Sequence, residues 1–287
     1  MYCHFYGFKE NPFVLTPDPK YLYLNQVYSE LLSSLFYGVQ NKQGFIVIIG
    51  DVGTGKTTLL NGLMDKLDQK TKVAFIFNTD ISFKQILTLA LAELGLTLSK
   101  KTYTMGEALQ YLNKFSIQQS RSGGNVVLII DEAQNLSKQA LENLRLISNI
   151  ETRRTKLIQI LLSGQPKLDY KLNRPDCRHL IQRISIKRYI SNLSEKDTYD
   201  YIEHRLKVCG YKGPPIFSKE SLKWIWKNTK GVPRMINMLC ENSLMIGYAT
   251  ETTTIGKHIV MEATRQLNYN PFKDKNWEEE PKDPFHF

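Results

Sequence analysis

The sequence has no long hydrophobic run. Its longest apolar stretches, such as residues 45–49 and 126–130, extend for five residues each, whereas a helix that crosses a bilayer needs about 20. The first residues lack the basic segment followed by an apolar segment that marks a secretory signal. We therefore expect no membrane-spanning segment and a cytoplasmic location.

Cysteine and histidine are few and scattered. The four cysteines include no C-x-x-C pair, and the five histidines are dispersed along the chain. A disulfide framework and a structural zinc site both depend on repeated or closely spaced ligands. Neither is expected here, and the cysteines are predicted to be reduced thiols, mostly buried.

Acidic residues are outnumbered, with 28 Asp and Glu against 38 Lys and Arg, which gives a net charge of +10. Most of the excess lies in residues 151–190, which hold ten basic and three acidic residues. Such a surface can bind nucleic acid or anionic lipid. It can equally face nucleotide phosphates and a neighbouring subunit, and both interpretations stay open.

The apolar residues form short runs that alternate with stretches of helical spacing. Four runs are typical of strands buried on both faces of a parallel sheet, at residues 45–49, 73–77, 126–130 and 157–162. Helical spacing occurs around and between them, at residues 26–40, 57–67, 83–94 and 106–119. This alternation predicts an α/β fold, a parallel sheet flanked by helices.

Beyond residue 190 the pattern becomes helical throughout. Ser194 and Asp197 have the spacing of a helix start, and Pro233 suits the first turn of a later helix. We expect helices over residues 194–210, 219–228 and 233–249. The predicted organisation is a first domain over 1–190, a small all-helical domain over 191–268, and a disordered tail over 269–287, which is rich in proline and glutamate.

One segment carries a complete phosphate-binding motif. Residues 50–57 are G-D-V-G-T-G-K-T and fit the pattern G-x-x-x-x-G-K-[ST] without a mismatch. Glycines let the backbone curl so that N–H groups converge on phosphate oxygens, and the next helix presents the positive end of its dipole. The motif sits between an apolar run and a helical stretch, as its function requires. It predicts an ATP site formed by Gly50, Asp51, Val52, Gly53, Thr54, Gly55, Lys56, Thr57 and Thr58.

The chemistry of the motif assigns individual side chains. Lys56 is expected to reach the β- and γ-phosphates, and Thr57 to place its hydroxyl on Mg²⁺. The run at 126–130 ends in Asp131 and Glu132, and ligands of such sheets bind beyond the carboxyl ends of the strands. We predict that Asp131 holds Mg²⁺ together with Thr57. Glu132 is predicted to orient and deprotonate the attacking water.

The order of these motifs, followed by a helical lid, resembles that of AAA+ ATPases over about residues 10–265. A narrower resemblance is to the general secretion pathway protein A family. It rests on F-Y-G-F-K-E-N-P-F at 5–13, T-P-D-P at 16–19, I-D-E-A-Q at 130–134, S-G-Q-P-K-L at 163–168 and G-V-P-R-M-I-N at 231–237. The resemblance implies a P-loop NTPase sheet with a small C-terminal lid.

The resemblance also implies further roles at matching positions. Gln165 corresponds to a polar sensor of the γ-phosphate or its water, and Arg234 to a second sensor that reaches the γ-phosphate from the lid. Asn78 either holds Glu132 inactive or simply ends a strand. An arginine finger from a neighbouring subunit is expected, with Arg183 preferred and Arg178 second.

Near the N-terminus, four residues are expected either to wall the adenine or to pack in the core: Pro12, Phe13, Tyr21 and Tyr23.

The leading functional hypothesis is an Mg-dependent ATPase that drives or gates assembly of a bacterial secretion (type II) or pilus complex. Its expected partners are nucleotide, further copies of itself in a ring or filament, and a membrane-anchored secretion or pilus protein that could hold it at the inner membrane. The alternative is an ATP-dependent DNA-binding regulator of the transposition type, although no helix-turn-helix or zinc finger is evident.

A small-molecule kinase fits the Asp-Glu pair and the helical lid less well. Full-length members of the secretion family continue into a transmembrane helix and a periplasmic peptidoglycan-binding domain. The 287 residues of this sequence stop after the lid and an acidic stretch, so membrane anchoring and wall binding are not expected of them.

Overall fold

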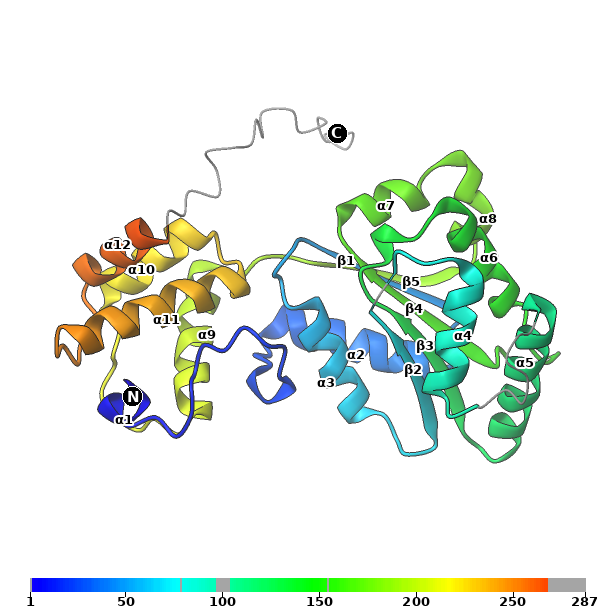
Figure 1. Ribbon diagram of the computed structural model, residues 1–287, viewed down its shortest axis with the longest axis horizontal. Coiled ribbons are helices and arrows are strands. Elements are labelled where there is room, and N and C mark those ends of the chain that lie inside the picture. The colour runs from blue at the N-terminus through cyan, green and yellow to red at the C-terminus, as the bar shows by residue number, and fades with distance from the viewer. Residues whose placement is uncertain (1, 78, 97–103, 154, 268–287) are drawn as a thin grey trace.

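A parallel five-stranded sheet forms the centre of the larger part of the protein (Figure 1). The computed structural model describes residues 2–77, 79–96, 104–153 and 155–267. The strand order is β2-β3-β4-β1-β5, and every neighbouring pair is parallel. The strands are β1 Phe45–Gly50, β2 Thr71–Ile76, β3 Asn125–Ile130, β4 Ile158–Gly164 and β5 Ile184–Ile190. The predicted α/β class and the four predicted strands are confirmed.

Strand β5 was not predicted, and its place in the sheet explains why. It lies at an edge and pairs only with β1. An edge strand needs no continuous apolar sequence, and here Lys187, Arg188 and Tyr189 interrupt the run, with Arg188 and Tyr189 exposed. The central β1 and β4, by contrast, are buried at every position.

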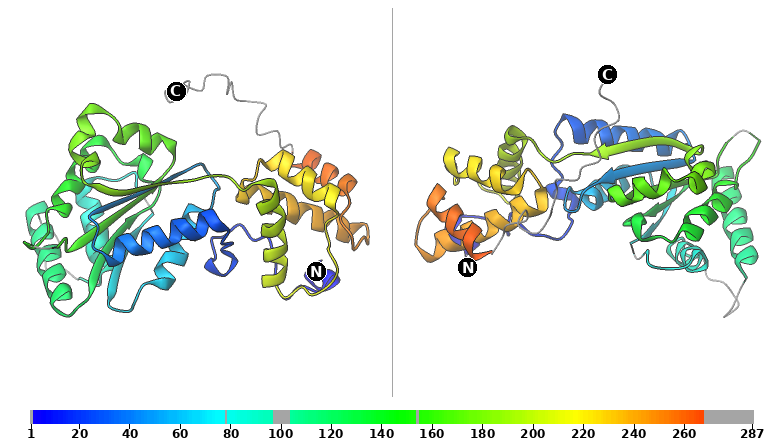
Figure 2. Two further views of the ribbon diagram at one scale, coloured as in Figure 1. Left: turned by 180° about the vertical axis from the view of Figure 1, so that it is seen from behind. Right: turned by 90° about the horizontal axis from the view of Figure 1, so that it is seen from above.

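Helices cover both faces of the sheet (Figures 1 and 2). Alternate strand residues point to opposite faces. On one face Ile46 and Ile48 of β1 pack in a core with α2 (Gln26–Gln40) and α3 (Lys56–Lys66). On the other face Val47 and Ile49 pack in a second core with the helices that follow β2, β3 and β4. Those helices are α4 Phe83–Glu93, α5 Met105–Arg121, α6 Lys138–Ser148, α7 Pro166–Leu172 and α8 Arg178–Ile181.

The C-terminal part of the described chain is helical, as predicted. It contains α9 Glu195–Val208, α10 Lys219–Thr229, α11 Pro233–Ala249 and α12 Lys257–Gln266, of which α12 was not predicted. Ser194 caps α9 by accepting the N–H of Asp197 at 3.1 Å, and Pro233 occupies the first turn of α11. Among the described helices, none is long and apolar enough to cross a membrane. The predicted tail, residues 269–287, lies outside the described residues.

The N-terminal segment lies against the C-terminal helices, about 240 residues away in sequence (Figure 1). Helix α1 (Tyr2–Tyr6) packs on α11, where the Tyr2 hydroxyl donates to Glu241 at 2.7 Å. The Asn11 amide donates to the other oxygen of Glu241 at 2.8 Å. The chain then passes through the short 3₁₀ turn η1 (Pro19–Tyr21) into α2. Residues 2–25 therefore connect the helical part to the sheet part a second time.

Candidate nucleotide-binding site

The phosphate loop leads from the carboxyl end of β1 into α3, at the edge of the sheet where all five parallel strands end. Gly53 and Gly55 have φ angles of 81° and 89°, in the left-handed region that glycine adopts without steric cost. Inside the loop, Thr54 is fully buried and its hydroxyl donates to the carbonyl of Asp51 at 2.8 Å. The Tyr28 hydroxyl of α2 donates to the Thr54 carbonyl at 2.6 Å. The curled backbone is thus fixed by its own side chain and by α2.

Lys56 is the cation of the loop. Only 5% of it is exposed, and its ammonium donates to the carbonyls of Gly50 and Asp51, both at 2.9 Å. Burial lowers the pKa of Lys56, while the nearby carboxylates of Glu132, Asp131 and Asp51 act in the opposite direction. The loop therefore holds a poorly hydrated positive charge beside the acids, where an anionic phosphate would stabilise it.

Thr57 and Asp131 meet although they are 74 positions apart, with the Thr57 hydroxyl donating to Asp131 Oδ2 at 2.6 Å. Asp131 is 3% exposed and continues β3, its N–H donating to the carbonyl of Ile76 on β2 at 2.9 Å. A hydroxyl and a carboxylate side by side are the hard oxygen ligands that Mg²⁺ prefers, and it commonly keeps waters and phosphate oxygens as its other ligands. This donor pair fits the predicted magnesium site.

Glu132 lies one residue beyond, in a strained backbone conformation. Its φ of 51° is in the left-handed region, which costs a non-glycine residue about 1–2 kcal/mol. Its Oε2 atom accepts hydrogen bonds from Gln134 Nε2 at 2.5 Å and from Gln165 Nε2 at 3.2 Å. Gln165, which follows β4, is therefore brought to the carboxylate of Glu132. Asn78, the other predicted partner of Glu132, lies outside the described residues.

The C-terminal helices close one side of the site. The N–H of Arg234, in the first turn of α11, donates to the carbonyl of Gly53 at 3.1 Å. One pocket is lined by the loop from Val52 to Thr58, by Glu132 and by Arg234. Further lining residues come from the helical part: Leu193, Tyr201, Arg205, Pro233 and Asn237. The lid and the phosphate loop thus form a single pocket.

The N-terminal segment closes the other end of this pocket. Tyr21 and Tyr23 line it, so they remain candidates for an adenine wall. Phe13 is 1% exposed and packs edge-on against Phe217, with ring centroids 6.2 Å apart, so core packing is the better interpretation for Phe13. The carbonyl of Pro12 accepts a hydrogen bond from the buried Arg205.

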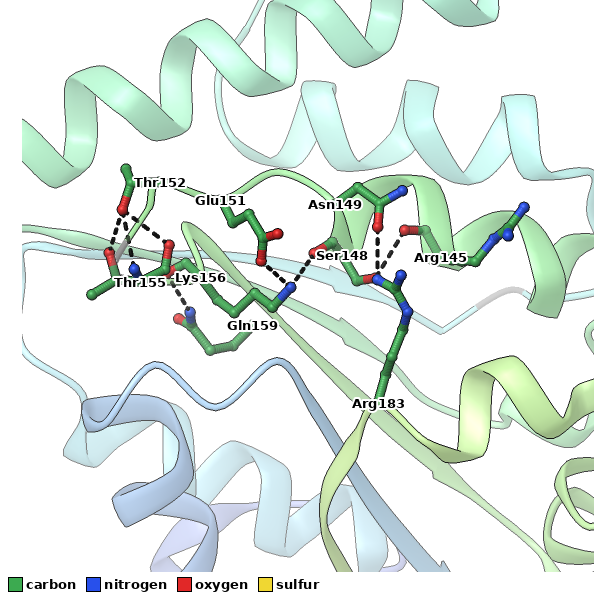
Figure 3. Close-up of polar contacts among 9 residues, drawn as sticks. All are labelled: Arg145, Ser148, Asn149, Glu151, Thr152, Thr155, Lys156, Gln159 and Arg183. Carbon is green, nitrogen blue, oxygen red and sulfur yellow. Dashed lines mark hydrogen bonds and ion pairs between the residues drawn. The ribbon is translucent and has the colours of Figure 1, made fainter.

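Arg183 does not join this pocket. It immediately precedes β5, whose first residue pairs with the first residue of β1, so it lies at the edge of the sheet opposite the phosphate loop. The six-residue β1 separates the two edges by roughly 17 Å. Figure 3 shows its guanidinium directed at the end of α6, where it donates to Ser148 and Asn149, both at 2.7 Å. Arg178, the second choice, is exposed at the start of α8.

Three residues at or near the site were missed by sequence reasoning. Gln134 belongs to the I-D-E-A-Q segment but was assigned no role, although it is 3% exposed and bonded to Glu132. Tyr28 belongs to the apolar stripe of α2, which looks like ordinary core. Arg205 places its guanidinium 4.3 Å from the Tyr21 ring centroid and also donates to the Val14 carbonyl. A charged residue on the buried face of α9 was the available signal.

Comparison with known proteins finds a matching family and a similar protein. A family described as "AAA domain" matches residues 39–172. The chain is 36% identical over 249 residues to general secretion pathway protein A of Aeromonas hydrophila, which covers 87% of this chain. The aligned region is 45% of that relative's length, so this chain spans about half of it.

Solved structures share the fold at low sequence identity. The ORC2 protein of Aeropyrum pernix, solved in ADPNP–ADP complexes, superposes with a TM-score of 0.66 at 17% identity, covering 85% of this chain and 68% of that one. The Cdc6p protein of Pyrobaculum aerophilum gives 0.65 at 17% identity, covering 88% and 70%. The RuvB Holliday junction branch migration motor of Thermotoga maritima gives 0.58 at 15% identity, covering 86% and 70%.

Proposed function

We propose that this chain, an AAA+ ATPase related to general secretion pathway protein A, binds Mg-ATP between its phosphate loop and its helical lid and hydrolyses it there. The observation that carries the proposal is the contact between Thr57 Oγ1 and Asp131 Oδ2 at 2.6 Å. This pair of metal ligands lies beside a pocket that Lys56, Glu132 and Arg234 line together. Cation, metal ligands, base and lid arginine are the parts that hydrolysis of a nucleoside triphosphate requires.

Each part of the site has a separate task. The loop amides and Lys56 neutralise the phosphates, and Thr57 and Asp131 hold Mg²⁺, which supplies further positive charge to the phosphate oxygens. Glu132 orients a water and accepts its proton as that water attacks the γ-phosphate. Gln165 and Arg234 contact the γ-phosphate from the sheet and from the lid. The backbone N–H of Arg234 also bonds the loop. Loss of the γ-phosphate would therefore remove a contact of the Arg234 side chain at the start of α11, next to the loop.

We further propose that the cycle drives or gates assembly of a bacterial secretion or pilus complex, with a membrane-anchored partner protein. The support is the 36% identity to a secretion pathway protein across the sheet and the helical part. Arg183 lies at the sheet edge opposite its own pocket, so as an arginine finger it would act on the nucleotide of a neighbouring copy, in a head-to-tail ring or filament.

DNA binding stays the second candidate, because the net charge is +10. Several basic residues of the 151–190 segment are engaged within the chain, however. Lys156 pairs with Glu151, Lys187 pairs with Asp169, and Arg183 is bonded to α6. The DNA hypothesis requires affinity for a labelled duplex that falls steeply with salt. Absence of binding at low salt would remove it.

The test of the ATPase proposal is Glu132→Gln. Loss of the base should reduce phosphate release by about 10²- to 10⁴-fold, while Mg-ATP still binds because Lys56, Thr57 and Asp131 are intact. Glu142→Gln is a matched control, since Glu142 lies on α6, ten positions on. Turnover by Glu132→Gln at the parent rate would remove Glu132 as the base.

A further inference from the structure

Gln134 bridges the segment after β3, which contains Glu132, and the segment after β4, which begins with Gln165, at the carboxyl edge of the sheet. It lies in the 3₁₀ turn η2 (Ala133–Asn135) directly after Glu132. Its side-chain amide nitrogen donates to Glu132 Oε2 at 2.5 Å, and its amide oxygen accepts the backbone N–H of Gln165 at 3.0 Å. Only 3% of the residue is exposed, so both polar atoms of this side-chain amide form their hydrogen bonds inside the protein.

The orientation of the Gln134 amide is fixed by these partners. The Gln165 N–H can only donate and the carboxylate can only accept, so the amide oxygen must face the former and the amide nitrogen the latter. Gly164 makes room for it, since a Cβ there would lie 2.9 Å from the Gln134 oxygen. Lys171 of α7 fixes the turn itself by donating to the carbonyls of Gln134 and Leu136 at 2.6 and 2.9 Å.

Glu132 is thereby held through one of its two oxygens. Both glutamine amides donate to Oε2 of this pocket-lining carboxylate, and neither bonds Oε1. The Gln165 contact is the longer of the two, 3.2 Å against 2.5 Å. Gln165 can therefore turn to a phosphate oxygen while Gln134 continues to hold the carboxylate.

We propose that Gln134 is a positioning residue for hydrolysis, one that fixes the Glu132 carboxylate relative to Gln165. This inference rests on the proposed role of Glu132 as the base. Gln134 itself is not among the described residues that line the pocket, so it acts through Glu132. Its removal is expected to change the rate of the chemical step and to leave nucleotide affinity alone.

The first test is Gln134→Ala, measured by ATP turnover and by the Kd for Mg-ATP. A carboxylate held only by the longer bond from Gln165 samples wrong orientations, so kcat should fall by about tenfold, less than on loss of the base itself, with Kd unchanged. Gln139→Ala is the matched control, because Gln139 is exposed on α6 and its side-chain amide donates to Asn143 on the same helix. An unchanged kcat, a raised kcat, or an equal loss of affinity would each overturn the inference.

A second variant separates positioning from packing. Gln134→Met keeps most of the length and volume of the side chain but has no N–H to donate to Glu132 Oε2. Its kcat should therefore fall about as far as that of Gln134→Ala, because both variants lose the bond to the carboxylate. A Gln134→Met protein with the kcat of the parent would show that the side chain only fills space, and would contradict the inference.

The proposed function and the role of Gln134 can fail separately. A folded parent protein that does not hydrolyse ATP at all would remove the proposed function and the inference with it. A parent that hydrolyses ATP, with Gln134→Ala indistinguishable from Gln139→Ala, would remove the inference alone. Thermal unfolding of each variant shows whether any loss of rate merely follows from loss of structure.

Discussion

Replacing Gly53 by alanine tests whether the helical part and the phosphate loop form one site. Gly53 has a φ of 81°, and a Cβ added to it would lie 2.8 Å from the Cβ of Arg234 and 3.2 Å from Cγ1 of Val232. The Gly53 carbonyl also accepts the N–H of Arg234. The substitution therefore strains the loop and pushes the start of α11 away from it.

The chain offers a control that isolates the backbone cost. Gly123 has a φ of 76° with nothing within 4 Å of its added Cβ, so Gly123→Ala carries only the left-handed penalty, about 1–2 kcal/mol of unfolding free energy. At Gly53 the crowding adds about 1–3 kcal/mol if the lid stays in place. If the lid moves instead, the free energy of nucleotide binding weakens by the same amount, and each 1.4 kcal/mol raises Kd about tenfold.

We expect Gly53→Ala to weaken Mg-ATP binding by about tenfold or more and Gly123→Ala to leave it unchanged. A titration with a fluorescent ATP analogue gives the two Kd values, and urea unfolding gives the two stabilities. If Gly53→Ala bound the analogue as tightly as the parent did and was no less stable than Gly123→Ala, the close approach of α11 to the loop would have no part in nucleotide binding.

The remaining predictions concern the subunit contact and the thiols. Arg183→Ala and Glu132→Gln should each hydrolyse ATP slowly when tested alone. A mixture of the two should recover part of the turnover, because a mixed interface brings an intact Arg183 to an intact Glu132. A mixture no faster than its components would exclude Arg183 as the finger. Burial raises the pKa of Cys209 to about 11 and that of Cys240 well above its ordinary value, so at pH 8 only about one Cys209 in a thousand is a thiolate. A disulfide reagent should therefore label the half-buried Cys3 first, and equally fast labelling of Cys240 in native protein would contradict the packing described here.

The fold could be predicted from the sequence where local pattern and tertiary environment agree. The fully buried β1 is a continuous apolar run, β4 is a mostly apolar run that contains Gln159 and Ser163, and the phosphate loop is a complete motif placed between a strand and a helix. Strand β5 was missed because one edge of it faces away from the sheet, which permits Lys187 and Arg188 within the run.

The missed parts of the site are contacts between segments far apart in sequence. Arg205 donates to the carbonyl of Pro12, 193 positions away, and Tyr28 anchors the loop from the middle of an apolar helix. The proposed role of Gln134 depends on its contact with Gln165, which β4 brings within hydrogen-bond distance. For Tyr28 and Gln134, no periodicity or spacing in the sequence carries this information. The roles of Gln165, Arg234 and Arg183 stay predictions, with the first two now placed at the site and the third outside it.

Titration calorimetry with Mg-ATP, on the parent protein and on Lys56→Ala, tests the central claim most directly. We expect saturable binding of one nucleotide per chain to the parent. Lys56→Ala should lose that binding, because the phosphates lose the buried ammonium that Gly50 and Asp51 hold in place. No heat of association with well-folded parent protein, or equal binding by both proteins, would contradict the claim that this loop binds the nucleotide.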